Sequence, residues 1–263
     1  MVDPQSFLDL VVATARQKHA AAKARQNPNP TAEKPRDAIF DALHMVGKAI
    51  ADQGFSFVPS GPKFSRRSGD FTFAIYIQSD RNNAAGQRAA IWVHVMVNSK
   101  SLNAWRKKQP SDWIRPKSSF PAPVFGSQLG YLCAPFGWVE WDFVDSTKRR
   151  SVADDLIASL RRGAFPLFAA FEGEPEDIAA IANQSLRWPE GILGYLLSIG
   201  RASLANEVLQ AYLNEQPEVW RDFKRHCSQF LENGIPAYGS VPTDDARSLA
   251  AFAVATGLSV NDS

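Results

Sequence analysis

The stretch DFTFAIYIQSDRNNAAGQRAAIWVHVMVNS, residues 70–99, predicts two strands joined by a polar loop. Successive side chains in a strand point to opposite faces of the sheet. One face of this pair is entirely apolar and is predicted to face the core: Phe71, Phe73, Ile75, Ile77, Ile91, Val93, Val95 and Val97. The second face carries Tyr76, Trp92, His94 and Met96, which suit neither a uniform core nor a solvated surface. We expect that face either to receive the C-terminal helices or to bind a partner.

The segments around this pair predict an α+β fold, with N-terminal helices, a mostly antiparallel sheet and then an all-helical part. Helical spacing covers residues 5–26 and 36–53 before the sheet. The segments 131–134 and 138–144 are further strand candidates, and the second places Trp138 and Trp141 on opposite faces. After Asp145 the pattern is helical, with a predicted break at Gly163. We expect one domain over residues 1–150 and a helical one over 151–263, and the two could share a core.

The composition is that of an ordinary soluble protein, with 45% hydrophobic and 21% charged residues in 263. No signal peptide and no apolar run of membrane-spanning length is evident. Cys133 and Cys227 lie far apart and outside any metal-binding spacing, which predicts two structural thiols in a reduced, cytoplasmic protein.

Charge is unevenly distributed along the chain. Residues 1–150 contain 21 Lys and Arg against 12 Asp and Glu, whereas residues 151–263 contain 8 against 15. The net charges of +9 and −7 give the total of +2. Such a chain could present a basic surface and an acidic one, which would steer its partners.

No motif for catalysis, a cofactor or a metal is recognisable. The sequence contains no nucleophile elbow, phosphate-binding glycine loop or paired histidines. Glu140 and Asp142 would share one strand face about 7 Å apart, a spacing compatible with acid/base chemistry. Strict alternation favours a solvated outer face instead. An enzyme with an unrecognised site around Glu140, Asp142 and His94 stays open as an alternative.

Nucleic-acid binding is a second alternative. Short basic clusters lie at residues 66–67, 106–108 and 148–150, and the predicted first helix has a basic end with Lys18, Lys23 and Arg25. Tyr76, Trp92 and Trp105 could stack on bases. Each cluster is short and lies outside any known recognition motif, which favours a solvated face.

A Gly-Phe pair, a G-x-x-F-x-R motif and a strand ending in Ile-Gln-Ser follow one another here. The matching residues are Gly54, Phe55, Gly61, Phe64, Arg66, Ile77, Gln78 and Ser79. This pattern resembles the bacterial domain of unknown function 4304, over about residues 35–170. The segment DDLIASLRRGAFPLF, residues 154–168, resembles the helix after that family's sheet. The N-terminal helix, the Pro-rich connection at 110–123 and the long helical C-terminal part depart from the family's pattern.

The resemblance implies an accessory or immunity-type protein encoded near bacterial toxin systems, with no catalytic residues to carry over. We therefore expect a non-enzymatic protein-binding module without cofactor, metal or membrane, whose partner could be a toxin. Its oligomeric state stays open. The expected partner-binding residues are the polar-aromatic sheet face and an acidic helical surface: Tyr76, Trp92, His94, Glu172, Glu174 and Glu176.

Overall fold

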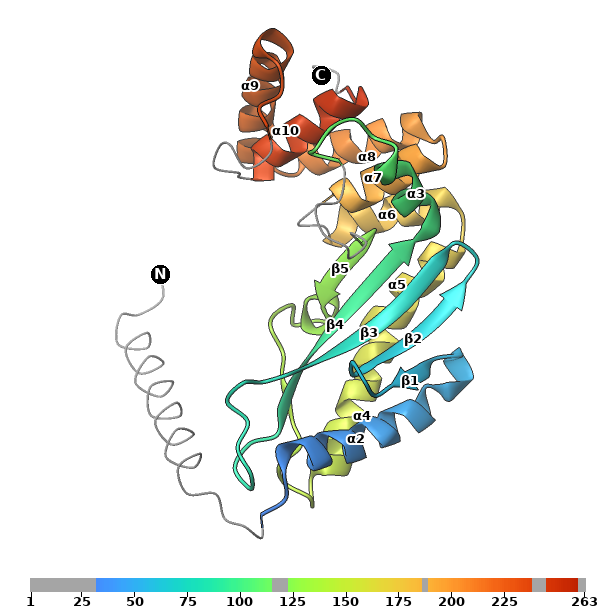
Figure 1. The fold of residues 1–263 in the computed structure, drawn as a ribbon, viewed down its shortest axis with the longest axis vertical. Helices are drawn as coiled ribbons and strands as arrows, with labels where there is room; N and C mark the ends of the chain where they lie inside the picture. The colour runs from blue at the N-terminus through green and yellow to red at the C-terminus, as the bar shows by residue number, and fades with distance from the viewer. Residues whose placement is uncertain (1–31, 115–122, 186–188, 238–244, 260–263) are drawn as a thin grey trace, which may run out of the picture. The chain divides into compact units, whose positions relative to one another are not determined.

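The computed structural model describes residues 32–114, 123–185, 189–237 and 245–259 (Figure 1). The α+β prediction is confirmed: helix α2 (Pro35–Ala49) precedes an antiparallel sheet, and a mainly helical part follows. The predicted helix at residues 5–26 lies outside the described residues.

The sheet follows chain order as β1-β2-β3-β4-β5, and β6 pairs with β4 beside that path. Its strands are β1 (Ser56–Val58), β2 (Lys63–Ser68), β3 (Phe71–Ser79), β4 (Ala90–Ser99), β5 (Phe125–Gln128) and β6 (Trp141–Asp142). In the antiparallel β4–β6 pair, Ile91 lies opposite Trp141. The short strand β6 therefore pairs with the N-terminal end of β4, and Trp141 lies beside the core-facing Ile91.

The core face predicted from the alternating pattern is confirmed. All eight apolar residues of that face are buried. On the second face Tyr76, Trp92, His94 and Met96 are only half-buried. The two faces of the strand pair thus differ in burial as well as in composition.

The strand candidate at 138–144 is shorter than predicted, since only Trp141–Asp142 forms a strand. Two other predicted features of the chain are wrong. Residues 131–134 form no strand, because the short 3-10 helix η2 (Leu129–Leu132) begins where the Gln128 side chain accepts a hydrogen bond from the Gly130 amide. The chain also stays helical through Gly163, from α4 (Arg149–Ser159) through a π-helical turn (Leu160–Ala164) into α5 (Phe165–Glu172). Glycine is needed there for packing, since a Cβ atom would lie 2.8 Å from the Cys133 sulfur.

The chain forms two compact units, each made of separate segments. The described part of unit 1 is 32–66, 75–94 and 128–164, and that of unit 2 is 67–74, 95–114, 123–127 and the segments from 165 onward. Each unit combines a portion of the sheet with helices. The division near residue 150 stays a prediction.

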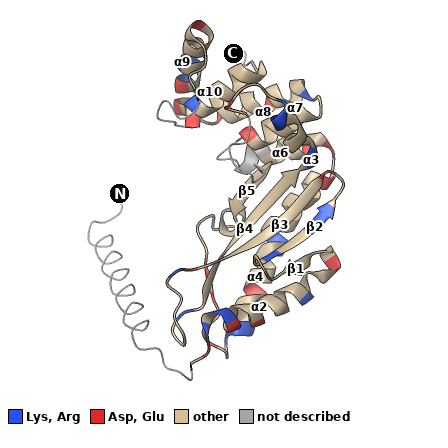
Figure 2. Ribbon diagram, in the orientation of Figure 1, with Lys and Arg blue, Asp and Glu red and all other residues tan. Residues whose placement is uncertain are grey.

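In unit 1, helix α2 packs on the core face and against α4. Gly47 approaches the Phe64 ring so closely that a Cβ atom would lie 3.1 Å from it. Arg149 of α4 is buried and pairs with Asp41 of α2 at 3.0 Å and with Glu33 at 2.5 Å. Residues of both charge signs therefore lie together on α2 and beside it (Figure 2).

In unit 2, helix α5 supplies aromatic residues to the core. Phe168 packs on Phe73 and Phe171 on Phe71, with ring centroids 4.8 and 5.4 Å apart. The remaining helices are α3 (Lys100–Lys107), α6 (Pro175–Ser185), α7 (Glu190–Ser198), α8 (Ala202–Asn214), α9 (Pro217–Asn233) and α10 (Asp245–Thr256). Within the described ranges, none of the helices has both the length and the apolar character needed to cross a membrane.

Candidate functional site: an aromatic surface in unit 1

The half-buried face of β4 is in contact with a tryptophan from the connection between β5 and β6. The Trp138 ring lies edge-on to Trp92, with centroids 5.3 Å apart and planes at 72°. It also lies edge-on to His94, at 6.0 Å and 69°. We call these three residues the aromatic surface.

The loop that carries Trp138, residues 129–139, is held by hydrogen bonds to its backbone. The buried Gln128 side chain accepts a hydrogen bond from the Gly130 amide at 2.7 Å and donates one to the Val139 carbonyl at 2.5 Å. The Gly137 amide donates to the Gly130 carbonyl. Gly130 has no room for a side chain, because a Cβ atom would lie 2.2 Å from the Gly137 oxygen. The loop closes tightly on itself, and its aromatic side chains are left on the outside.

Three large apolar side chains of this loop are exposed to solvent. Their exposed fractions are 49% for Tyr131, 75% for Phe136 and 52% for Trp138. Among the described residues, Leu231 of α9, in unit 2, is the other large apolar side chain exposed to this degree. Exposed apolar side chains are thus concentrated in one short loop.

A polar partner holds His94, one of the two strand residues of the aromatic surface. The His94 Nε2 atom lies 3.0 Å from the Gln78 side-chain oxygen. Burial lowers the pKa of His94 below its usual value of 6.5, so the ring is neutral at pH 7. Tyr76, also on this face of the sheet, is capped by the Lys63 ammonium at 5.2 Å from its ring centroid.

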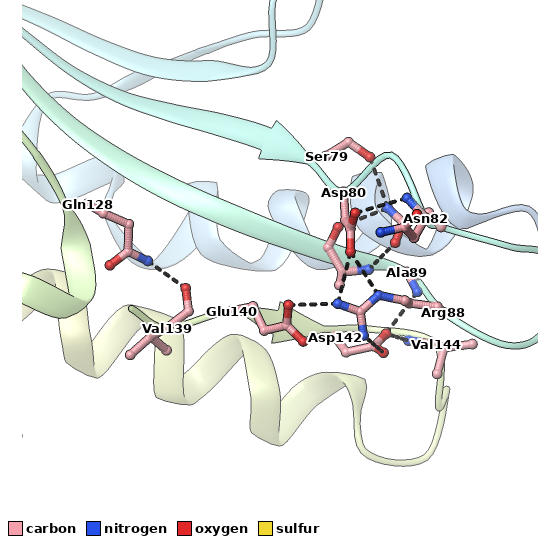
Figure 3. Close-up of polar contacts among 12 residues, drawn as sticks. Ser79, Asp80, Asn82, Arg88, Ala89, Gln128, Val139, Glu140, Asp142 and Val144 are labelled. Atoms are coloured by element: carbon pink, nitrogen blue, oxygen red, sulfur yellow. Dashed lines mark hydrogen bonds and ion pairs between the residues drawn. The ribbon is translucent and has the colours of Figure 1, made fainter. Parts of the chain in front are cut away.

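An ion-pair cluster lies where the 129–139 loop leads into strand β6 (Figure 3). Arg88, at the end of the β3–β4 loop, points its guanidinium at three carboxylates. Its nitrogens lie 3.0 Å from Asp80, 2.6 Å from Glu140 and 3.9 Å from Asp142. Burial alone would lower the pKa of Arg88, but the hydrogen bonds with Glu140 and Asp80 raise it. We call these four residues the Arg88 cluster.

The structure brings Glu140 and Asp142 together as predicted, but around Arg88. An Asp142 oxygen also accepts hydrogen bonds from the Ala89 and Val144 amides. His94 has Gln78 as its hydrogen-bond partner instead of either carboxylate. Trp138 is 52% exposed, whereas Trp141 is 3% exposed and donates a hydrogen bond from its indole nitrogen to Asp155 of α4. In the described part of the chain, no group of three His, Cys, Asp or Glu residues could hold a metal ion.

The predicted acidic residues lie in unit 2, where α5 ends and α6 begins. Glu172, Glu174 and Glu176 are all exposed. Glu176 pairs with Arg201. The structure therefore divides the six predicted partner-binding residues between the two units.

Most cations of the predicted basic clusters have partners within the chain. Arg149 is held by Glu33 and Asp41, and Arg150 by Asp154 at 3.2 Å. Arg66 lies over the Phe55 ring. Arg106 is buried, and that burial lowers its pKa. These contacts reduce the positive charge available for phosphates in the described residues.

Sequence reasoning missed Phe136, Tyr131 and Arg88 as members of a site. The segment Ala-Pro-Phe-Gly-Trp, residues 134–138, did carry a signal: bulky aromatics between proline and glycine are unusual for a solvated turn. The contact of Arg88 with Glu140 joins residues 52 positions apart, and no local pattern reports it.

No known family model, curated protein or solved structure matches this chain. The resemblance to domain of unknown function 4304 therefore stays a prediction.

Proposed function

We propose that this chain is a non-enzymatic protein-binding module whose partner docks on the aromatic surface and the adjoining loop of unit 1. The observation that carries the proposal is the exposure of Tyr131, Phe136 and Trp138 within eight residues. Aromatic residues are enriched at the centres of protein interfaces and often dominate their binding energy.

The loop has the mechanical properties that such a surface needs. Gln128 and Gly130 fix its backbone, and Trp92 fixes the Trp138 ring. A partner would therefore bind without first having to order these side chains, which lowers the entropic cost of association. Three apolar side chains are exposed to water on a backbone that is fixed by hydrogen bonds. Binding of a partner explains this exposure better than packing within the chain does.

The immunity-type role implied by the family resemblance agrees with this surface. An immunity protein works by direct binding and needs no catalytic group of its own. We propose a protein toxin as the class of partner.

The test is affinity capture from a lysate of the native cell with tagged full-length chain, at low and moderate salt. The variants are Phe136→Ser combined with Trp138→Ser, and Leu231→Ser as the control for removal of an exposed apolar side chain elsewhere. We expect one stoichiometric protein to be retained by the wild type and the control, and lost from the double variant. Equal retention by all three, or release of nucleic acid alone as salt rises, would contradict the proposal.

A further inference from the structure

We infer that the partner segment on the aromatic surface is basic, with an Arg or Lys side chain stacked on Trp138 and paired with Glu140. This inference rests on the proposed function and specifies the chemistry of its partner. Three observations carry it, namely the charge of the Arg88 cluster, the position of Glu140 and the exposure of Trp138.

The Arg88 cluster carries an excess of negative charge. Asp80, Glu140 and Asp142 surround the single guanidinium of Arg88. Three carboxylates and one cation leave a formal charge of −2 beside the aromatic surface. A partner with acidic residues at this place would meet like charges, whereas a basic partner would be attracted.

Glu140 is the member of the cluster best placed to meet a partner. Its side chain is 41% exposed, compared with 5% for Asp80. Arg88 engages its Oε2 atom, and no donor from the described residues is bonded to Oε1. Glu140 follows Trp138 by two positions, so both belong to the short stretch that enters β6. A guanidinium or ammonium group could therefore reach the carboxylate and the indole together.

Trp138 supplies the second half of the site. Tryptophan is the best cation–π acceptor among the side chains, and half of this one is open to solvent. Its neighbour His94 adds no positive charge at pH 7, because burial keeps that imidazole neutral. The surface therefore combines an aromatic platform with a negative field, which suits a cationic side chain.

The test titrates the full-length chain with the peptide acetyl-Gly-Arg-Gly-Arg-Gly-amide and with the same peptide carrying citrulline in place of arginine. Citrulline keeps the shape and loses the charge. The readout is the indole N–H resonances of Trp92 and Trp138 at low ionic strength. Glu140→Gln is the test variant, because glutamine still accepts a hydrogen bond from Arg88. Glu207→Gln removes the same charge from an exposed position in unit 2.

We expect the arginine peptide to shift the Trp138 resonance, Glu207→Gln to behave as wild type, and Glu140→Gln to bind about threefold to fivefold more weakly. Equal shifts with the citrulline peptide, or unchanged affinity in Glu140→Gln, would overturn the inference. If a captured partner depends on Trp138 while the arginine peptide causes no shift, this inference fails and the proposed function stands. If capture is independent of Trp138, both fail.

Discussion

The indole ring of Trp138 lies edge-on to that of Trp92, with ring centroids 5.3 Å apart. This contact joins the loop before β6 to the half-buried face of β4. It explains why that face is neither core nor ordinary surface: Trp92 and His94 support a third aromatic ring that is 52% exposed. The second face of the sheet is thus the base of a larger surface built by residues distant in sequence.

Gly130 is predicted to be essential for that surface. Gly130→Ala would place a Cβ atom 2.2 Å from the Gly137 backbone oxygen, and a backbone atom cannot rotate away. We expect a loss of about 2 kcal/mol in the free energy of unfolding, together with weaker partner binding. Urea denaturation and a binding titration measure the two effects.

Gly137→Ala is the matched control, because a Cβ atom there meets no heavy atom within 4 Å. It should unfold as the wild type does. Equal losses in both variants would show that the loop closure around Gly130 is not what holds the aromatic side chains in place.

Arg88 is predicted to stabilise unit 1 through its three carboxylates. Its side chain is 15% exposed, so Arg88→Met leaves Asp80, Glu140 and Asp142 close together without a cation. We expect the free energy of unfolding, measured in urea, to be about 2–3 kcal/mol lower than that of the wild type. This loss is at the low end for a broken buried ion pair, because two of the three carboxylates reach solvent.

Arg150→Met provides the comparison for Arg88. Arg150 pairs with Asp154 one helical turn away, with both side chains largely exposed. Such a pair contributes less than about 0.5 kcal/mol. A loss for Arg150→Met as large as that for Arg88→Met would contradict the role given to the Arg88 cluster.

His94 is predicted to make stability depend on pH below 6.5. Burial holds its folded-state pKa below that value, so the unfolded chain binds a proton before the folded chain does. This contribution is fully present above pH 6.5 and is lost as the pH falls towards the folded-state pKa. The effect is small because the ring is half-exposed.

The measurement for His94 compares the free energy of unfolding at pH 7.5 and pH 5.0 in wild type and His94→Gln. The wild type should lose more stability than the variant over this interval, since other titrating groups are common to both. An identical loss in both proteins would show that His94 titrates as it does in the unfolded chain.

The sequence predicted the sheet core because alternation in a strand is a local property. Phe73, Ile75, Val93 and Val95 are buried on the face where the pattern placed them. The C-terminal helices were also predicted from a local property, the helical spacing of apolar residues. Trp138 lies outside strand β6 (Trp141–Asp142), so alternation in a strand did not set its position.

The rest depended on contacts between distant residues. Gln128 fixes the 129–132 segment through a bond to Val139, 11 positions away, and Gly163 in the π-helical turn lies against the Cys133 sulfur. The Arg88 cluster needs the β4–β6 pairing, which brings a carboxylate 52 positions away to the guanidinium. Neither spacing nor composition reports such contacts, so only part of the candidate site was predicted from the sequence. Tyr76, Trp92 and His94 were identified as candidate binding residues, whereas Trp138 was given no role.

The most direct test of the proposed binding surface is the dissociation constant of the captured partner, measured by calorimetry with wild type, Trp138→Ser and Leu231→Ser. Truncation of a central aromatic residue at an interface commonly costs about 2 kcal/mol, or roughly 30-fold in affinity. We predict a loss of that size for Trp138→Ser and an unchanged constant for Leu231→Ser. Equal affinity for wild type and Trp138→Ser would contradict the assignment of the aromatic surface as the binding site.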